Sequence, residues 1–77
     1  MLSVKYFGEI EERVGTSEER LPQQVKTLSH LLAYLKSEHH IQEQWIKVAV
    51  NHELVTDSST VLKETDEIAI LSPFAGG

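Results

Sequence analysis

One amphipathic segment constrains this chain more than any other feature of its sequence. Its leucines recur at the i, i+3, i+4 and i+7 spacing of one helix face, at positions Leu28, Leu31, Leu32 and Leu35. Thr27, directly before them, is a residue type that caps helix N-termini. A helix with one apolar face must bury that face against another layer, so the remaining segments have to supply a second layer.

Short apolar segments around this helix predict that the second layer is a sheet. The segments expected to form strands are 2–7, 17–22, 47–51, 54–55 and 68–71, with a short helical turn in 8–15. Residues 68–71 are apolar at consecutive positions, which is typical of a strand that is covered on both faces or lies centrally. Together these segments predict a two-layer α+β fold with three or four strands on one helix.

The size of the chain limits where any chemistry can take place. A chain of 77 residues buries only about 60% of its unfolded surface, which leaves no room for an enclosed substrate cavity beside a core. We therefore expect chemistry at the surface or inside a partner. The sequence contains no cysteine, which excludes disulfides, thiolate nucleophiles and cysteine-based zinc sites.

Charge and hydropathy argue against nucleic acids and membranes as partners. The net charge is −5, and the lysines are scattered singly instead of forming the basic patch that phosphate binding requires. The longest apolar runs are far shorter than the roughly 20 residues that span a bilayer. The N-terminal segment MLSVKYFGEI lacks the basic start and apolar middle of a signal peptide. We therefore expect a cytoplasmic protein that binds neither nucleic acid nor membrane.

The histidines and glutamates predict neither a metal site nor a pair of catalytic carboxylates. His39 and His40 are adjacent and so point to different faces of a helix, and His30 has no partner at metal-ligand spacing. We interpret the histidines as solvated side chains at a helix end. The glutamates are likewise interpreted as a solvated face, because no apolar pocket is evident to separate their pKa values; they are Glu9, Glu11, Glu12, Glu18 and Glu19.

The C-terminal segment predicts a carrier function. Pro73 ends the last predicted strand, and Gly76 and Gly77 close the sequence. Glycine lacks Cβ, so such an end can enter a channel too narrow for other residues. A terminal carboxylate is anionic at neutral pH and must be activated before transfer, for instance as an acyl-adenylate made from ATP. The chain has no phosphate-binding motif, so a separate enzyme would activate it. The alternative interpretation is a frayed end without a role.

Four apolar residues are candidates for a patch near this tail: Phe7, Leu54, Leu71 and Phe74. Phe7 lies opposite the side of the first strand that carries Val4 and Tyr6, and Phe74 lies beyond the proline that ends the last strand. If these residues are exposed together, they form a partner interface. The alternative is that they complete the core; for Phe74 we favour the interface.

Six segments together carry a resemblance to a known family. They are VKYF, GEIEERVG, TLSHLLAYL, VAVNHELV, TDEIAILSP and the final GG, in this order over essentially the whole chain. With them the chain resembles the small subunit of molybdopterin synthase, a family of ubiquitin-like β-grasp sulfur carriers. The resemblance implies one domain over residues 1–77, with a mixed four- to five-stranded sheet packed on one main helix and a flexible tail over 73–77. The first and last strands would be central and parallel.

The resemblance also implies a mechanism. An adenylyltransferase related to ubiquitin activators would use ATP to form an acyl-adenylate on Gly77, and a sulfur donor protein would convert it to a thiocarboxylate. The tail would then enter the large synthase subunit, where its sulfur builds the dithiolene of molybdopterin on cyclic pyranopterin monophosphate. The carrier would bind no cofactor, with catalytic residues on the large subunit in a heterotetramer of two carriers and two large subunits.

The resemblance assigns roles to individual positions. Those matched to the partner interface are Phe7, Leu54, Leu71, Pro73, Phe74 and Ala75, and those at the reacting end are Gly76 and Gly77. Two positions depart from the family pattern. Many members have an arginine where Glu11 stands, while the nearest arginine here is Arg13, and a second proline where Ser72 stands. These departures bear on a charged contact with the large subunit and on the rigidity of the tail.

Three other functions stay open on the sequence. A thiamin-type sulfur carrier also ends in two glycines, but typically has a shorter connection between its first two strands than the one here, which runs through Arg13 and Val14. A ubiquitin-like protein modifier would form isopeptide conjugates on lysines. An inert β-grasp binding module would tolerate the deletion of Gly77, which a carrier would not.

Overall fold

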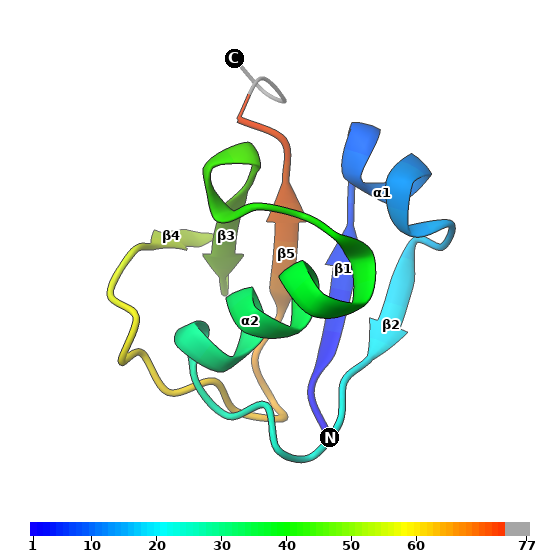
Figure 1. Cartoon of the computed structure of the whole chain (residues 1–77). Coiled ribbons are helices and arrows are strands. Elements are labelled where there is room, and N and C mark those ends of the chain that lie inside the picture. The colour runs from blue at the N-terminus through cyan, green and yellow to red at the C-terminus, as the bar shows by residue number, and fades with distance from the viewer. Residues whose placement is uncertain (74–77) are drawn as a thin grey trace.

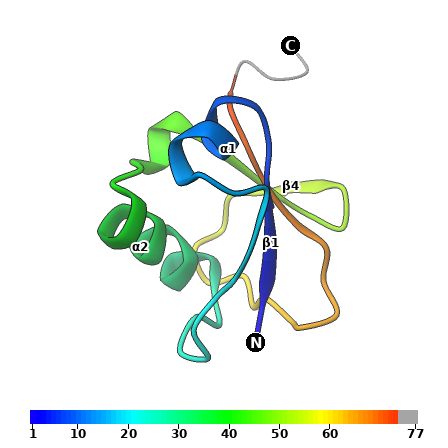
Figure 2. The same cartoon turned by 90° about the vertical axis from the view of Figure 1, so that its right-hand side faces the viewer.

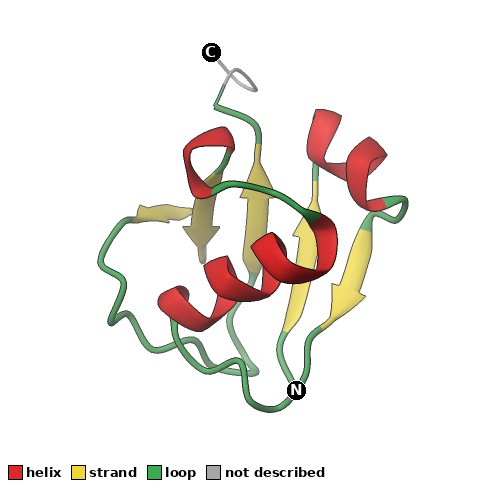
Figure 3. Ribbon diagram, viewed as in Figure 1, coloured by secondary structure: helices red, strands yellow, loops and turns green. Residues whose placement is uncertain are grey.

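Each segment that the sequence predicts as a strand forms one in the structure, a computed structural model that describes residues 1–73 (Figures 1 and 3). In chain order the elements are β1 (Ser3–Tyr6), α1 (Gly8–Val14), β2 (Glu18–Arg20), α2 (Leu28–His39), the 3-10 helix η1 (Glu43–Trp45), β3 (Lys47–Val50), β4 (Glu53–Val55) and β5 (Ile68–Leu71). α1 is longer than the short turn expected there. It ends at Gly15, whose φ of 93° is a backbone conformation that suits glycine.

The strands form one mixed sheet in the order β2-β1-β5-β3-β4. β1 and β5, the first and last strands, are adjacent and parallel, with Val4 opposite Ile68. The other neighbouring strands pair antiparallel. A parallel pair needs a long connection between its strands, and here that connection includes α2. The arrangement confirms the α+β, ubiquitin-like β-grasp fold and the central position of β5.

α2 packs across one face of the sheet and closes the core there (Figure 2). The least exposed large side chains of this core are Val4, Tyr6, Leu21, Leu31, Leu35, Ile41, Ile68 and Ile70. The Thr27 hydroxyl caps α2 as predicted, accepting a hydrogen bond from the backbone N–H of His30 at 3.2 Å. Leu32 is only half-buried, packs against the core and lines a groove beside β4. None of the helices within residues 1–73 has the length and apolar character needed to cross a membrane.

A two-residue turn at Asn51 and His52 joins β3 to β4 and fixes their register. Both residues have positive φ angles, 53° and 72°, as the tight hairpin turns that match the twist of a sheet require. The Asn51 amide donates to Asp66 Oδ1 at 3.0 Å, and its oxygen accepts from the backbone N–H of Glu67 at 2.9 Å. The turn is therefore tied to the segment that leads into β5, so the position of Leu54 relative to β5 is set by backbone geometry.

Candidate functional site

The face of the sheet opposite α2 carries a groove, which we call the sheet-face groove. It is lined by Lys5, Phe7, Ala49, His52, Leu54, Glu67, Ala69 and Leu71. These residues come from β1, β3, β4 and β5 and from the segments next to them. The groove thus extends across the middle of the sheet. Figure 2 shows α2 on the other face of the sheet.

Strand register explains why this face is hollow. Ala69 on β5 pairs with Lys5 on β1 and with Ala49 on β3, and Ala49 pairs in turn with Leu54 on β4. Residues directly opposite each other in a sheet share a face, so one row crosses four strands with two alanines in its middle. The small alanine side chains form the floor of the groove, and larger side chains surround it.

Three residues that the sequence assigned to a partner interface meet in this groove. Leu54 is 58% exposed and Phe7 is 43% exposed, while Leu71 is half-buried. The backbone N–H of Phe7 donates to the carbonyl of Ile70 at 3.2 Å, which fixes Phe7 beside the end of β5. Of the two alternatives considered, completion of the core is therefore wrong for Phe7 and Leu54. Their contact with a partner stays a prediction.

Polar groups border the apolar centre of the groove. His52 Nε2 lies 2.7 Å from Glu67 Oε2, and both side chains are well exposed. Lys5 stands exposed on the β1 side. An apolar centre with a polar rim is the usual composition of a protein–protein interface.

β5 ends at one end of the sheet (Figure 1), and its last residue, Leu71, lines this groove. Pro73, half-buried, follows the strand after one residue as predicted, but it does not line the sheet-face groove. It lies instead in a second groove, with Arg13 and Trp45. The other predicted site residues, Phe74, Ala75, Gly76 and Gly77, lie outside the described part of the chain.

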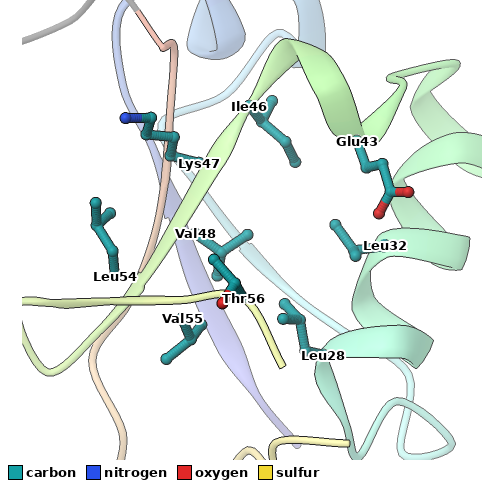
Figure 4. Close-up of a pocket in the computed structure, with 9 residues that line it drawn as sticks. All are labelled: Leu28, Leu32, Glu43, Ile46, Lys47, Val48, Leu54, Val55 and Thr56. Atoms are coloured by element: carbon teal, nitrogen blue, oxygen red, sulfur yellow. The ribbon is translucent and has the colours of Figure 1, made fainter. Parts of the chain in front are cut away.

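A further apolar groove lies between α2 and the β4 edge (Figure 4). Leu28 and Leu32 face Val48 and Val55 across it. It shares only Leu54 with the sheet-face groove and contains no residue of β5.

The structure corrects the interpretation of Glu19 and His39 as solvated. Glu19 accepts hydrogen bonds from the hydroxyls of Tyr6 at 2.7 Å and Tyr34 at 2.9 Å, and its Oε1 lies 2.9 Å from His39 Nε2. The His39 ring also packs edge-on against both tyrosine rings. Pairing of β2 with β1 and the crossing of α2 bring these side chains together, which sequence spacing does not reveal.

The electrostatics of this cluster follow from burial and hydrogen bonding. Burial alone would raise the pKa of Glu19, but hydrogen bonds from Tyr6, His39 and Tyr34 outweigh it and lower the pKa below its ordinary value. Burial and the bond to Glu19 raise the pKa of Tyr34 to about 12 and that of Tyr6 further still. All three hydrogen-bonding groups thus favour an ionised Glu19. Over residues 1–73, neither these nor other His, Asp or Glu side chains gather in a way that could hold a metal ion.

Three residues at these sites were not predicted from the sequence: Ala49, Ala69 and Trp45. Ala49 and Ala69 form the groove floor, and the signal was a small residue at alternate positions of two otherwise branched strands. Trp45 lies with Arg13 near Pro73, and only the presence of a tryptophan in a polar segment pointed to Trp45.

Comparisons with known proteins agree with the fold. The model of the ThiS family matches residues 4–77. No curated protein sequence matches the chain significantly.

Several solved structures have the same fold as this chain. The putative molybdopterin converting factor, subunit 1, of Pyrococcus furiosus is 25% identical with a TM-score of 0.73, over 94% of this chain and 95% of that one. The small archaeal modifier protein 1 of Methanosarcina acetivorans is 26% identical with a TM-score of 0.72, over 99% and 95% of the two chains. A chain in the complex of subunits 1 and 2 of the molybdopterin-converting factor of Helicobacter pylori is 26% identical with a TM-score of 0.70, over 99% and 97%.

Proposed function

The chain belongs to the ThiS family, and from that membership we propose that it is the sulfur-carrier subunit of a molybdopterin synthase. One structural observation supports this proposal in addition to the family membership. The central strand β5 ends beside an exposed apolar groove, so a partner that binds the groove also receives the chain segment that follows β5. A carrier needs this combination, because its reacting end must enter the active site of another protein.

The proposed chemistry takes place on Gly77. Its carboxylate oxygen attacks the α-phosphorus of ATP in a separate adenylyltransferase related to ubiquitin activators, and pyrophosphate leaves. A sulfur donor protein supplies sulfide, which displaces AMP and leaves a thiocarboxylate. The sulfur then passes to cyclic pyranopterin monophosphate in the large subunit, and water restores the carboxylate. Adenylation is required because the ionised carboxylate is a poor electrophile and AMP is a good leaving group. The need for ATP fits a cytoplasmic carrier.

The proposed main partner is the large subunit of the synthase. The groove offers it Phe7, Leu54 and Leu71, and the similar chain from Helicobacter pylori was solved in a complex with subunit 2. Pro73, Phe74 and Ala75 would follow the groove toward the partner's active site, with Gly76 and Gly77 inside it. We propose an assembly of two carriers and two large subunits in which the carrier itself holds no cofactor.

Incubation with the adenylyltransferase, ATP and sulfide tests this function. We expect the intact mass of the carrier to rise by the difference between sulfur and oxygen. The sulfurated carrier should then convert cyclic pyranopterin monophosphate to molybdopterin when the large subunit is added. A variant that lacks Gly77, and one with an added residue after it, serve as matched controls and should show neither result while keeping the wild-type melting temperature. An unchanged mass, under conditions that sulfurate a known carrier, contradicts the proposal.

A ubiquitin-like protein modifier is the second candidate, favoured by the 26% identity to the small archaeal modifier protein 1 of Methanosarcina acetivorans. That function predicts isopeptide conjugates of Gly77 to lysines, which mass spectrometry of cell extracts detects. A thiamin-type carrier is less consistent with the structure, because the seven-residue helix α1 lengthens the connection between β1 and β2.

A further inference from the structure

The groove that contains Pro73, which we call the exit groove, lies where the chain leaves the sheet. In Figure 1, α1 and the end of β5 lie at the same end of the sheet. The exit groove is lined by residues of α1 and η1 and by the two residues after β5, namely Glu9, Ile10, Arg13, Gln44, Trp45, Ser72 and Pro73. The last described residue of the chain therefore lies in this groove, and four residues follow it.

The exit groove offers an aromatic surface and a cation. The guanidinium carbon of Arg13 lies 5.0 Å from the centroid of the Trp45 ring, within the range of a cation–π interaction. The Trp45 side chain is itself 40% exposed. No ion pair within residues 1–73 includes Arg13. A guanidinium that stacks on a ring through its face keeps its N–H edge for an anion. The groove can therefore bind a short segment that carries an aromatic ring and a carboxylate.

The four residues after Pro73 supply both of these groups. Phe74 follows Pro73 directly, and in the proposed carrier Gly77 bears the reacting carboxylate. Four extended residues span about 13–14 Å, roughly half of the 26 Å that the molecule measures along its longest axis. Gly76 and Gly77 lack Cβ, so the chain can reverse its direction there. A segment that starts in the groove at Pro73 is therefore long enough to return its carboxylate to Arg13.

We propose that residues 74–77 dock reversibly in the exit groove of the carrier when no partner is bound. Phe74 packs on Trp45, and the Arg13 guanidinium donates hydrogen bonds to the Gly77 carboxylate. The position of Pro73 in the groove and the charge complementarity of Arg13 and Gly77 argue for this occupant. The inference rests on the proposed function, because the docked carboxylate is the group that the adenylyltransferase must reach. Docking thus withholds Gly77 until an enzyme binds the released tail, and it weakens the apparent affinity by the docked fraction.

Nuclear magnetic resonance of the whole chain tests the docked tail. We expect nuclear Overhauser effects between the rings of Phe74 and Trp45, which is the only tryptophan. In Arg13→Gln these effects should weaken at least threefold, and the Gly77 amide resonance should move toward its random-coil position. Sodium chloride at 1 M should move it in the same direction in the wild type, because the Debye length falls to about 3 Å. Arg20→Gln is the matched control, because Arg20 is also exposed but lies on the edge strand β2, and it should leave both signals unchanged.

Deletion of residues 74–77 gives a second measurement. We expect the fluorescence maximum of Trp45 to shift to longer wavelength, because water replaces Phe74 on its ring. If the Gly77 resonance is the same in Arg13→Gln and the wild type, the docked tail is wrong. Signals that disappear on dilution would mean that the tail of a second copy occupies the groove, which also contradicts docking within one chain. In both cases the proposed function stands, because sulfuration of Gly77 does not require docking. A docked tail in a carrier that is never sulfurated contradicts the proposed function and the regulation of Gly77 with it.

Discussion

The two faces of the sheet are built from neighbouring residues of the same strands, but α2 covers only one of them. On β5, Ile68 and Ile70 point toward α2 and are almost fully buried, while Ala69 and Leu71 on the other face stay half-buried. On the covered face, α2 packs over the apolar side chains and buries them. The open face has no covering layer within residues 1–73. One face thus supplies the stability of the fold, and the other is available for a partner.

The polar groups of the two faces show the same contrast. Glu19, beside the covered face, has three hydrogen-bonding partners and side-chain exposure of only 25%. The pair of His52 and Glu67 on the rim of the open face is 87% and 50% exposed. Exposed polar contacts of this kind contribute little to stability, because water and salt screen them. The comparison therefore predicts that changes on the covered face affect folding, and changes on the open face affect binding.

The largest difference in the free energy of unfolding is expected between alanine variants of two adjacent residues of β5. Ile70→Ala should lower the free energy of unfolding by about 2–5 kcal/mol, because it opens a cavity in a fully buried site. Leu71→Ala should lower it by less than half of that, because water already reaches Leu71. Urea denaturation of both variants measures the difference. Equal losses would mean that the open face contributes as much to folding as the covered one.

Glu19→Gln should lower the free energy of unfolding by about 1–3 kcal/mol at neutral pH, because hydrogen bonds to a charged group are lost or weakened. The pKa of Glu19 is lower in the folded protein than its ordinary value of 4.5. The ionised form is therefore stabilised by folding. This stability is present above pH 4.5 and is lost as the pH falls through the lowered pKa.

The pH dependence of stability distinguishes the contribution of Glu19 from that of other acidic groups. Asp57, Glu64 and Asp66 also have lowered pKa values, so the wild type loses stability in acid for several reasons. The difference between wild type and Glu19→Gln isolates the contribution of Glu19 and should shrink below pH 4.5. His52→Gln, on the open face, is the control and should leave the stability at neutral pH nearly unchanged. A difference that does not vary with pH would show that Glu19 acts through packing alone.

On the open face, Leu54→Ala should raise the Kd for the large subunit about tenfold, equivalent to 1.4 kcal/mol. Leu54 is 58% exposed, so its removal should change the free energy of unfolding by less than about 1 kcal/mol. Val61→Ala is the matched control, because Val61 is 62% exposed but lies outside the sheet-face groove. Isothermal titration calorimetry gives both Kd values. Similar affinities for the two variants would exclude Leu54 from the interface.

The covered face was predictable from the sequence to a large extent. Period-two alternation in β1 places Val4 and Tyr6 on one side of the strand, and leucines at helical spacing place Leu31 and Leu35 on one helix face; all four are buried. Local patterns of this kind reflect the geometry of single elements, and the structure confirms them. β5 shows the limit of such patterns. Four consecutive apolar residues predict either burial on both faces or a central position, and only the central position is correct.

The candidate site was predictable only in part. Phe7, Leu54 and Leu71 were assigned to an interface through the family pattern, and the register brings them together. The alanine floor and the pair of Arg13 and Trp45 depend on contacts between segments that are distant in the sequence. Local spacing carries no information on such contacts. The cluster around Glu19 was missed for the same reason, since its members come from three different elements.

The smallest effect on the free energy of unfolding is expected when a residue of the groove floor is replaced by a larger one. Ala69→Val adds two carbon atoms to the open face and introduces a β-branched residue that strands favour, so the free energy of unfolding should change by no more than about 0.5 kcal/mol. Val4→Ile adds only one carbon atom, but on the fully buried face, where overpacking costs about 1–3 kcal/mol. Thermal unfolding of the two variants compares them directly. If Ala69→Val destabilises the protein as much as Val4→Ile, some other part of the chain or a second copy covers the open face. A partner would then have to displace that cover before it could bind.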